Sequence, residues 1–181
     1  MKTQRVATWA ASITDKPGGL AAKLKTLAAG GVLPSDGRLP IQPLDHRALD
    51  CVEGRILVHG EQEDGRAYMM LESTDGKIYA INHTRQMEGM RNRGGLRVNS
   101  FVRLRKLLVG GRARIEVEEL GTAESILENR GYLRQIVKGL ARRGAIPVDQ
   151  GWGGWLGRYQ RAVRRAANEL QPERDRIGIG R

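Results

Sequence analysis

Alternation of apolar and polar residues between positions 51 and 121 constrains the fold of this chain more than any other feature. The stretch from Met69 to Thr84 predicts a β-hairpin, because two apolar-rich runs flank Asp75-Gly76, a dipeptide that readily adopts the positive φ angles of a tight turn. A second hairpin is predicted across Gly110-Gly111. With one further alternating segment, the pattern predicts five short strands at residues 52–59, 66–72, 77–82, 101–109 and 112–119.

Five short strands favour a small closed barrel, because an open sheet of that size exposes its edge strands to water and to other chains. Val52, Gly54, Ile56 and Val58 are expected on one face of the first strand. The predicted fold class is therefore α+β, with a five-stranded OB/SH3-like β-barrel at residues 51–121 and helical segments on both sides.

The flanking regions show helical periodicity. Residues 1–50 are predicted to form an N-terminal helical, winged-helix-like segment, in which Leu20, Leu24 and Leu27 share one helical face. Residues 122–171 are predicted to form a C-terminal basic helical region. Residues 172–181 contain few apolar side chains and are expected to form a flexible tail.

The charge of the chain indicates a polyanionic partner. Arginine and lysine together number 31 against 20 acidic residues, which gives a net charge of +11. This excess favours nucleic acid or a membrane surface, and the predominance of arginine favours nucleic acid because guanidinium binds phosphate bidentately. A GC-rich coding sequence explains the arginine preference equally well.

Cysteine content and hydropathy bear on disulfide formation and membrane insertion. The single Cys51 excludes an internal disulfide, and no apolar run approaches the length of about 20 residues that a membrane-spanning helix needs. We expect a soluble cytoplasmic protein without membrane insertion.

No catalytic motif is evident. His46, His59 and His83 lie far apart in the sequence, so each is expected to be an isolated surface or strand residue rather than a metal ligand. Neither a phosphate-binding loop nor a serine nucleophile motif is present. We therefore predict that the protein is not an enzyme and has no catalytic residue, no metal ligand and no cofactor.

Two groups of arginines are the candidate nucleic-acid-binding residues. The first group lies in a predicted flexible loop from Arg85 to Arg97, where glycines let guanidinium groups follow a phosphate chain. The second lies on the last predicted helix, where no acidic residue occurs between Gly151 and Asn168. The candidates are Arg85, Arg91, Arg93, Arg97, Arg158, Arg161, Arg164 and Arg165.

Two tryptophans beside the second group allow two interpretations. Trp152 and Trp155 either stack on bases or attach the last helix to the core. The core is favoured, because Trp155, Tyr159 and Val163 share one helical face.

The stretch GRILVHGEQEDGRAYMMLESTDGKIYAI resembles the non-catalytic C-terminal region that follows the nuclease in VirD-type plasmid relaxases, the mobilisation proteins of conjugative transfer. The resemblance extends over residues 52–168. The positions that carry it are Gly54-Arg55-Ile56, Gly60, Asp64, Arg66, Tyr68, Glu72, Asp75-Gly76-Lys77, Tyr79 and Ile81. Relaxases nick DNA with a tyrosine beside a three-histidine metal site, and this chain lacks that combination, so no catalytic residue is carried over.

The resemblance implies a nucleic-acid-binding accessory domain of a bacterial plasmid mobilisation relaxase, with DNA as a more suitable partner than RNA. Relaxosome or secretion coupling proteins are the implied protein partners. The alternative function is a protein-interaction module or a type IV secretion substrate that the transfer machinery recognises.

Overall fold

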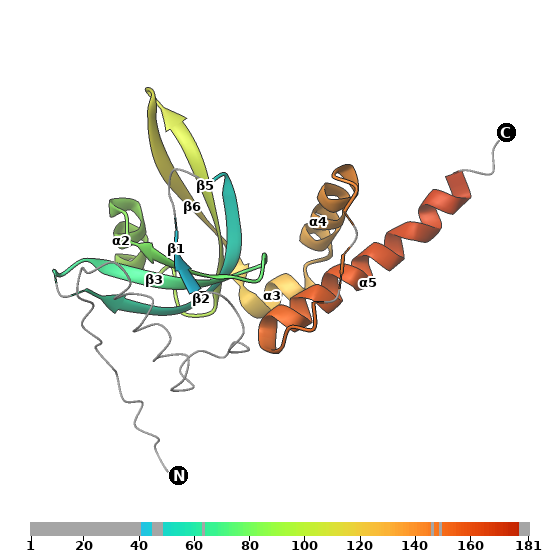
Figure 1. Cartoon of the computed structure of the whole chain (residues 1–181), viewed down its shortest axis with the longest axis horizontal. Coiled ribbons are helices and arrows are strands. Elements are labelled where there is room, and N and C mark those ends of the chain that lie inside the picture. The colour runs from blue at the N-terminus through green and yellow to red at the C-terminus, as the bar shows by residue number, and fades with distance from the viewer. Residues whose placement is uncertain (1–40, 45–48, 63, 146, 149, 178–181) are drawn as a thin grey trace, which may run out of the picture.

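The computed structural model describes residues 41–44, 49–62, 64–145, 147–148 and 150–177 (Figure 1). Most of the predicted N-terminal helical segment, and His46, lie outside these ranges. The described elements are β1 (Ile41–Pro43), β2 (Cys51–Glu61), β3 (Ala67–Ser73), β4 (Ile78–Asn82), α2 (Arg85–Asn92), β5 (Ser100–Val109), β6 (Arg112–Thr122), α3 (Ala123–Glu128), α4 (Arg130–Arg142) and α5 (Gly154–Ile177).

The strands form one six-stranded mixed sheet in the order β1-β4-β3-β2-β5-β6. Strand β1 runs parallel to β4, and the other neighbouring strands are antiparallel. The five predicted strands are present as β2 to β6. The prediction of a five-stranded closed barrel is nevertheless wrong, because β1 joins the sheet and the two edges, β1 and β6, remain apart.

Helix α2 explains why the sheet needs no closure. The segment predicted as a flexible loop contains this helix, whose N-terminus is capped by Thr84: its Oγ1 accepts a hydrogen bond from the amide nitrogen of Met87 at 3.3 Å. Met87 and Leu96 are almost fully buried against the sheet. One face of the sheet is therefore removed from water by a covering helix rather than by barrel closure.

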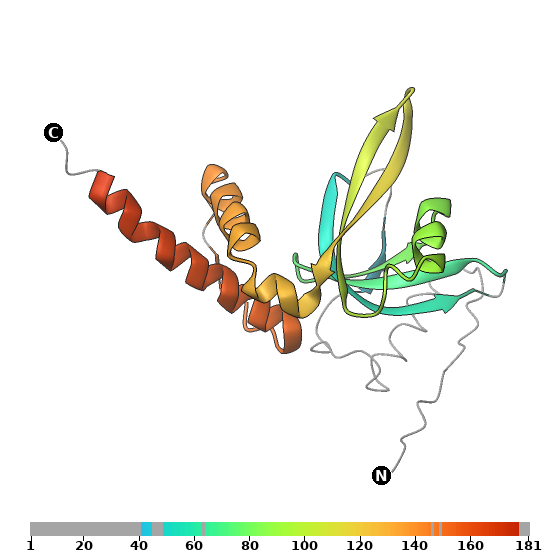
Figure 2. The ribbon, with the colours of Figure 1, turned by 180° about the vertical axis from the view of Figure 1, so that it is seen from behind.

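The sheet has a hydrophobic core on each face, because successive residues of a strand point to opposite sides. In β3, Met69 and Leu71 belong to the core that includes Met87 of α2, whereas Met70 belongs to the core under α3, α4 and α5. Accordingly, α2 and the three C-terminal helices lie on opposite sides of the sheet (Figures 1 and 2).

A β-bulge in β2 interrupts the predicted alternation. The pairing with β3 shifts register between Ile56 and Val58. Ile56 therefore contributes to the core on the side of α2, while Val58 packs against the core on the side of α3, α4 and α5. The expectation that Val58 shares a face with Val52 and Ile56 is wrong for this reason.

The first turns of helix α5 pack against the sheet and α3. Trp155 is 1% exposed, and its indole Nε1 donates a hydrogen bond to the carbonyl oxygen of Ala123 at 2.8 Å. Tyr159 stacks on Trp155 with ring centroids 5.4 Å apart. Beyond these turns α5 extends away from the sheet and continues to Ile177, so it includes residues 172–177 of the segment expected to be a tail (Figure 1).

Among the residues that the structure describes, no helix combines the length and the apolar character that crossing a bilayer requires.

Candidate nucleic-acid interface

The first predicted group of arginines lies on a helix and the turn that follows it. Arg85 and Arg91 are exposed residues of α2, and Arg93 is its C-terminal cap. Arg97 is also exposed, but its Nε donates a hydrogen bond to the carbonyl oxygen of Gly94 at 2.7 Å. The backbone that carries these arginines is therefore a helix and a hydrogen-bonded turn, and not the flexible loop that the sequence suggested.

The second predicted group is divided between two roles. Arg158 forms a bidentate ion pair with Glu124 of α3, with nitrogen–oxygen distances of 2.8 and 2.7 Å. This pair connects α5 to α3. Arg161, Arg164 and Arg165 are exposed on the next two turns of α5. Arg158 thus contributes to helix packing, and the arginines after it lie on the surface.

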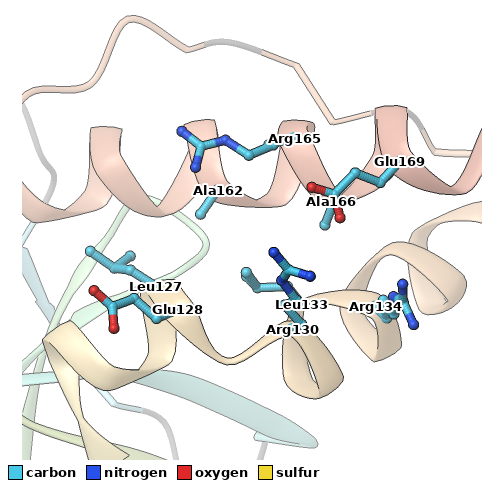
Figure 3. A pocket seen from close by; sticks show the side chains of 9 residues that line it. All are labelled: Leu127, Glu128, Arg130, Leu133, Arg134, Ala162, Arg165, Ala166 and Glu169. Atoms are coloured by element: carbon cyan, nitrogen blue, oxygen red, sulfur yellow. The ribbon is translucent and has the colours of Figure 1, made fainter.

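A groove lies where α3 and α4 meet α5 (Figure 3). Its volume is about 290 Å³, and four apolar residues and five charged residues line it. The apolar residues are Leu127, Leu133, Ala162 and Ala166, and the charged ones are Glu128, Arg130, Arg134, Arg165 and Glu169. Among the side chains that the structure describes, which end at Leu170, none forms an ion pair with Arg130, Arg134 or Arg165. The groove therefore combines apolar surface with cations that can bind an anionic partner.

Helix α4 adds a row of cations that the sequence analysis did not select. Arg130, Arg134, Lys138 and Arg142 recur every four residues and are all exposed, whereas Leu133 and its apolar neighbours face the core. Residues 129–168 contain nine arginines and lysines and one acidic residue, Asp149. The signal that could have identified this row is the scarcity of acidic residues, which begins well before Gly151.

The structure does not bring the eight predicted arginines together. Those on and after α2 lie on one side of the sheet, and those on α5 lie with α3 and α4 on the other side (Figures 1 and 2). The two groups are consequently separate candidate surfaces.

The two tryptophans serve the core, which confirms the favoured interpretation. Trp155 is buried, and Trp152 is half-buried against the same core. Neither ring is therefore free to act mainly as a stacking platform for bases.

Two histidines that are far apart in the sequence lie side by side. His59 Nδ1 is 3.2 Å from His83 Nε2, and His59 Nε2 is 2.6 Å from the carbonyl oxygen of Leu96. A carbonyl only accepts, so His59 Nε2 carries a proton and its Nδ1 accepts from His83 Nε2. The view that these two histidines are isolated is wrong. Among the described residues, no group of three or more histidine, cysteine or acidic side chains is placed to hold a metal ion.

The environment of this histidine pair favours its uncharged form. Burial, followed by the neighbouring His59 and Arg91, lowers the pKa of His83 to about 4. Burial also lowers the pKa of His59, against the effect of its hydrogen bond to Leu96. Both rings are accordingly neutral near pH 7, and the cationic character of this side of the sheet comes from arginine.

Comparison of the chain with models of protein families, with curated proteins and with solved structures found no match. The resemblance to a relaxase-associated region therefore depends on the sequence positions alone and stays a prediction.

Proposed function

We propose that this protein binds nucleic acid, and duplex DNA rather than RNA, through the exposed cations of α4 and α5. We call this surface the α4–α5 face. Its members are Arg130, Arg134, Lys138, Arg142, Arg143, Arg161 and Arg165. The observation that carries the proposal is the row on α4, in which four cations follow one another at intervals of four residues.

The row matches a phosphate chain in geometry. A helix rises about 1.5 Å per residue, so successive cations of the row are separated by about 6 Å along the helix axis. Each cation is also turned about 40° around the helix from the one before it, so the row winds gradually and can follow a phosphate chain that winds in the same way. Like charges four residues apart destabilise a helix by roughly 0.2–0.5 kcal/mol per pair, and a bound polyanion offsets that cost.

The resemblance to relaxase-associated regions suggests the setting. We propose that the protein is an accessory domain of a plasmid mobilisation relaxase in the bacterial cytoplasm, where it binds transfer DNA close to relaxosome or secretion coupling proteins. Its role is to hold DNA, and the chain does not cut it. Incubation with supercoiled plasmid and divalent metal ions should leave the plasmid intact.

Binding to a fluorescent DNA duplex, measured by anisotropy at several salt concentrations, tests the proposal. The affinity should fall linearly with the logarithm of the salt concentration, because each bound phosphate releases counterions. Arg134→Ala with Lys138→Ala should weaken binding to all duplexes alike and reduce the salt slope by roughly two units. Single-stranded DNA and RNA of the same length serve as competing ligands.

Two matched variants locate the surface. Arg158→Ala removes an arginine of α5 that is already paired with Glu124. It should therefore reduce the salt slope less than Arg134→Ala with Lys138→Ala does. Arg91→Ala with Arg93→Ala tests the surface beside α2. If only this last pair of substitutions reduces the affinity and the salt slope, the interface lies beside α2 and its assignment to the α4–α5 face is wrong. If the unmodified chain binds no nucleic acid, the protein-interaction or secretion-substrate alternative replaces the proposal.

A further inference from the structure

Among the described residues, the β5–β6 hairpin extends beyond the other strands of the sheet as a two-stranded ribbon, which we call the arm (residues 105–114). Strand β2 pairs with β5 only as far as the contact between Cys51 and Arg105. Past that point the amide nitrogen of Lys106 still donates a hydrogen bond to the carbonyl oxygen of Asp50 at 3.2 Å, and from Leu107 on the ladder joins β5 to β6 up to the pair formed by Val109 and Arg112. The arm projects from the body of the molecule in both views (Figures 1 and 2).

The tip of the arm carries exposed aliphatic side chains. Leu107, Leu108 and Val109 are 40%, 74% and 50% exposed. Three consecutive aliphatic residues in water at the end of a ribbon are unfavourable unless a partner covers them.

Cations accompany these aliphatic residues. The segment 105–114 contains four arginines or lysines and no acidic residue. Arg105 and Arg114 are exposed, and Arg114 lies directly opposite Leu107 in the ladder, on the same face of the ribbon. An apolar protein surface that covered Leu107 would desolvate this arginine without supplying a counter-charge. A nucleic-acid groove supplies apolar base edges and phosphates together.

We propose that the arm enters the major groove of duplex DNA tip first, so that Leu107 and Val109 on one face of the ribbon and Leu108 on the other contact thymine methyl groups, while Arg105 and Arg114 contact the phosphates along the groove. This inference rests on the proposed DNA-binding function and adds a contact to bases. It accounts for the exposed aliphatic tip, which the α4–α5 face leaves unexplained.

The dimensions of the arm fit this groove. Its four residues beyond Arg105 on β5 extend about 14 Å at about 3.4 Å each, and its two strands lie about 4.8 Å apart. The major groove is about 12 Å wide and admits a two-stranded ribbon, whereas the minor groove, about 6 Å wide, requires distortion of the duplex. In both views the arm and α4 extend toward the top of the picture, on either side of the strands near α3 (Figures 1 and 2).

The experiment compares the whole chain with a tip variant, Leu107→Ser with Leu108→Ser and Val109→Ser. Each protein is titrated against an A·T-rich duplex and against the same duplex with uracil in place of thymine, which lacks the methyl groups. The unmodified chain should prefer the thymine duplex. The tip variant should bind the thymine duplex about tenfold more weakly and lose that preference, with an unchanged salt slope.

Two further variants serve as controls. Arg105→Ala with Arg114→Ala should reduce the salt slope by roughly two units and keep the thymine preference. Val148→Ser removes an aliphatic side chain of comparable exposure, 60%, outside the arm, and should change neither quantity. Circular dichroism checks that each variant is folded.

The outcomes separate the inference from the proposed function. If the chain binds DNA and the tip variant keeps its affinity and thymine preference, the arm inference is wrong and DNA binding by the α4–α5 face stands. The arm inference is also contradicted if a minor-groove ligand displaces the protein from the duplex and replacement of thymine by uracil leaves the affinity unchanged. A tip variant that changes only self-association in analytical ultracentrifugation identifies the tip as a protein contact. If the unmodified chain binds no duplex, both proposals fail.

Discussion

The indole ring of Trp152 lies directly over Gly76. A Cβ atom added at residue 76 would fall 2.1 Å from Cζ2 of that ring. Gly76 is the turn residue of the β3–β4 hairpin, and Trp152 precedes α5 by two residues. The hairpin that dominates the sequence pattern is therefore a scaffold element, held by the segment that leads into the last helix.

We expect Gly76→Ala to destabilise the protein by roughly 2 kcal/mol, for two reasons. The residue has a φ of +81°, which an alanine adopts at a cost of about 1 kcal/mol, and the new methyl group displaces Trp152. Urea unfolding followed by tryptophan fluorescence measures the loss. Gly144→Ala is the matched control, because Gly144 also has a positive φ but no atom lies within 4 Å of its Cβ position. Equal losses in the two variants would contradict the role of Trp152.

A buried ion pair under α5 leads to the second prediction. Arg55 and Glu72 are directly paired across β2 and β3, are 7% and 1% exposed, and form an ion pair. Glu72→Ala should destabilise the protein by roughly 3–5 kcal/mol, because it leaves the guanidinium charge buried and unpaired. Thermal unfolding measures this change.

A double variant tests the same explanation from the other side. Arg55→Met with Glu72→Leu removes both charges and should recover most of the stability that Glu72→Ala loses. A double variant as unstable as the single one would show that packing, and not the unpaired charge, causes the loss.

The third prediction concerns the contact between the sheet and α4. Tyr132 donates its hydroxyl hydrogen to Glu53, which is also paired with Arg103. Burial, followed by the charges of Tyr159 and Glu53, raises the pKa of Tyr132, so this hydroxyl stays protonated and able to donate. Tyr132→Phe should cost about 1–3 kcal/mol in the free energy of unfolding, because a largely buried carboxylate loses a donor.

The control for this prediction is the neighbouring tyrosine. The hydroxyl of Tyr159 is 3.3 Å from that of Tyr132 and does not donate to Glu53. Tyr159→Phe should therefore cost less than Tyr132→Phe in the same unfolding assay. The reverse order would show that the hydrogen bond to Glu53 contributes little.

The fourth prediction is a pH dependence of stability. The pKa of His83 is lowered from 6.5 to about 4 in the folded protein, first by burial and then by His59 and Arg91. Between these values the unfolded chain binds more protons than the folded one. The contribution of His83 is therefore complete above pH 6.5 and is lost as the pH falls toward 4.

Urea unfolding at about pH 7 and about pH 5.5 measures this effect above the range in which most carboxylates titrate. The unmodified chain should be less stable at the lower pH. His83→Gln keeps a donor for His59 Nδ1 and removes the titrating ring, so it should lose less stability between the two pH values. An equal loss in both proteins would assign the pH dependence to other groups.

Local sequence was sufficient for the strands and for the roles of single aromatic residues. Alternation and the Asp75-Gly76 turn predicted the hairpin because both depend on backbone geometry within a few residues. The position of Trp155 on an apolar helical face predicted its burial for the same reason. The contact between Trp152 and Gly76 could not be predicted from local sequence, since 76 residues separate the two.

Sheet closure and the grouping of the arginines were decided only in the tertiary structure. Helix α2 was mistaken for a loop because its eight residues include Gly89 and few apolar side chains, and its stability comes from burial of Met87 against the sheet. That burial covers one face, so the sheet stays open and places α2 and α5 on opposite sides. Charge along the sequence predicted a polyanion, but the side of the sheet on which each arginine lies is set by long-range packing, which periodicity does not encode.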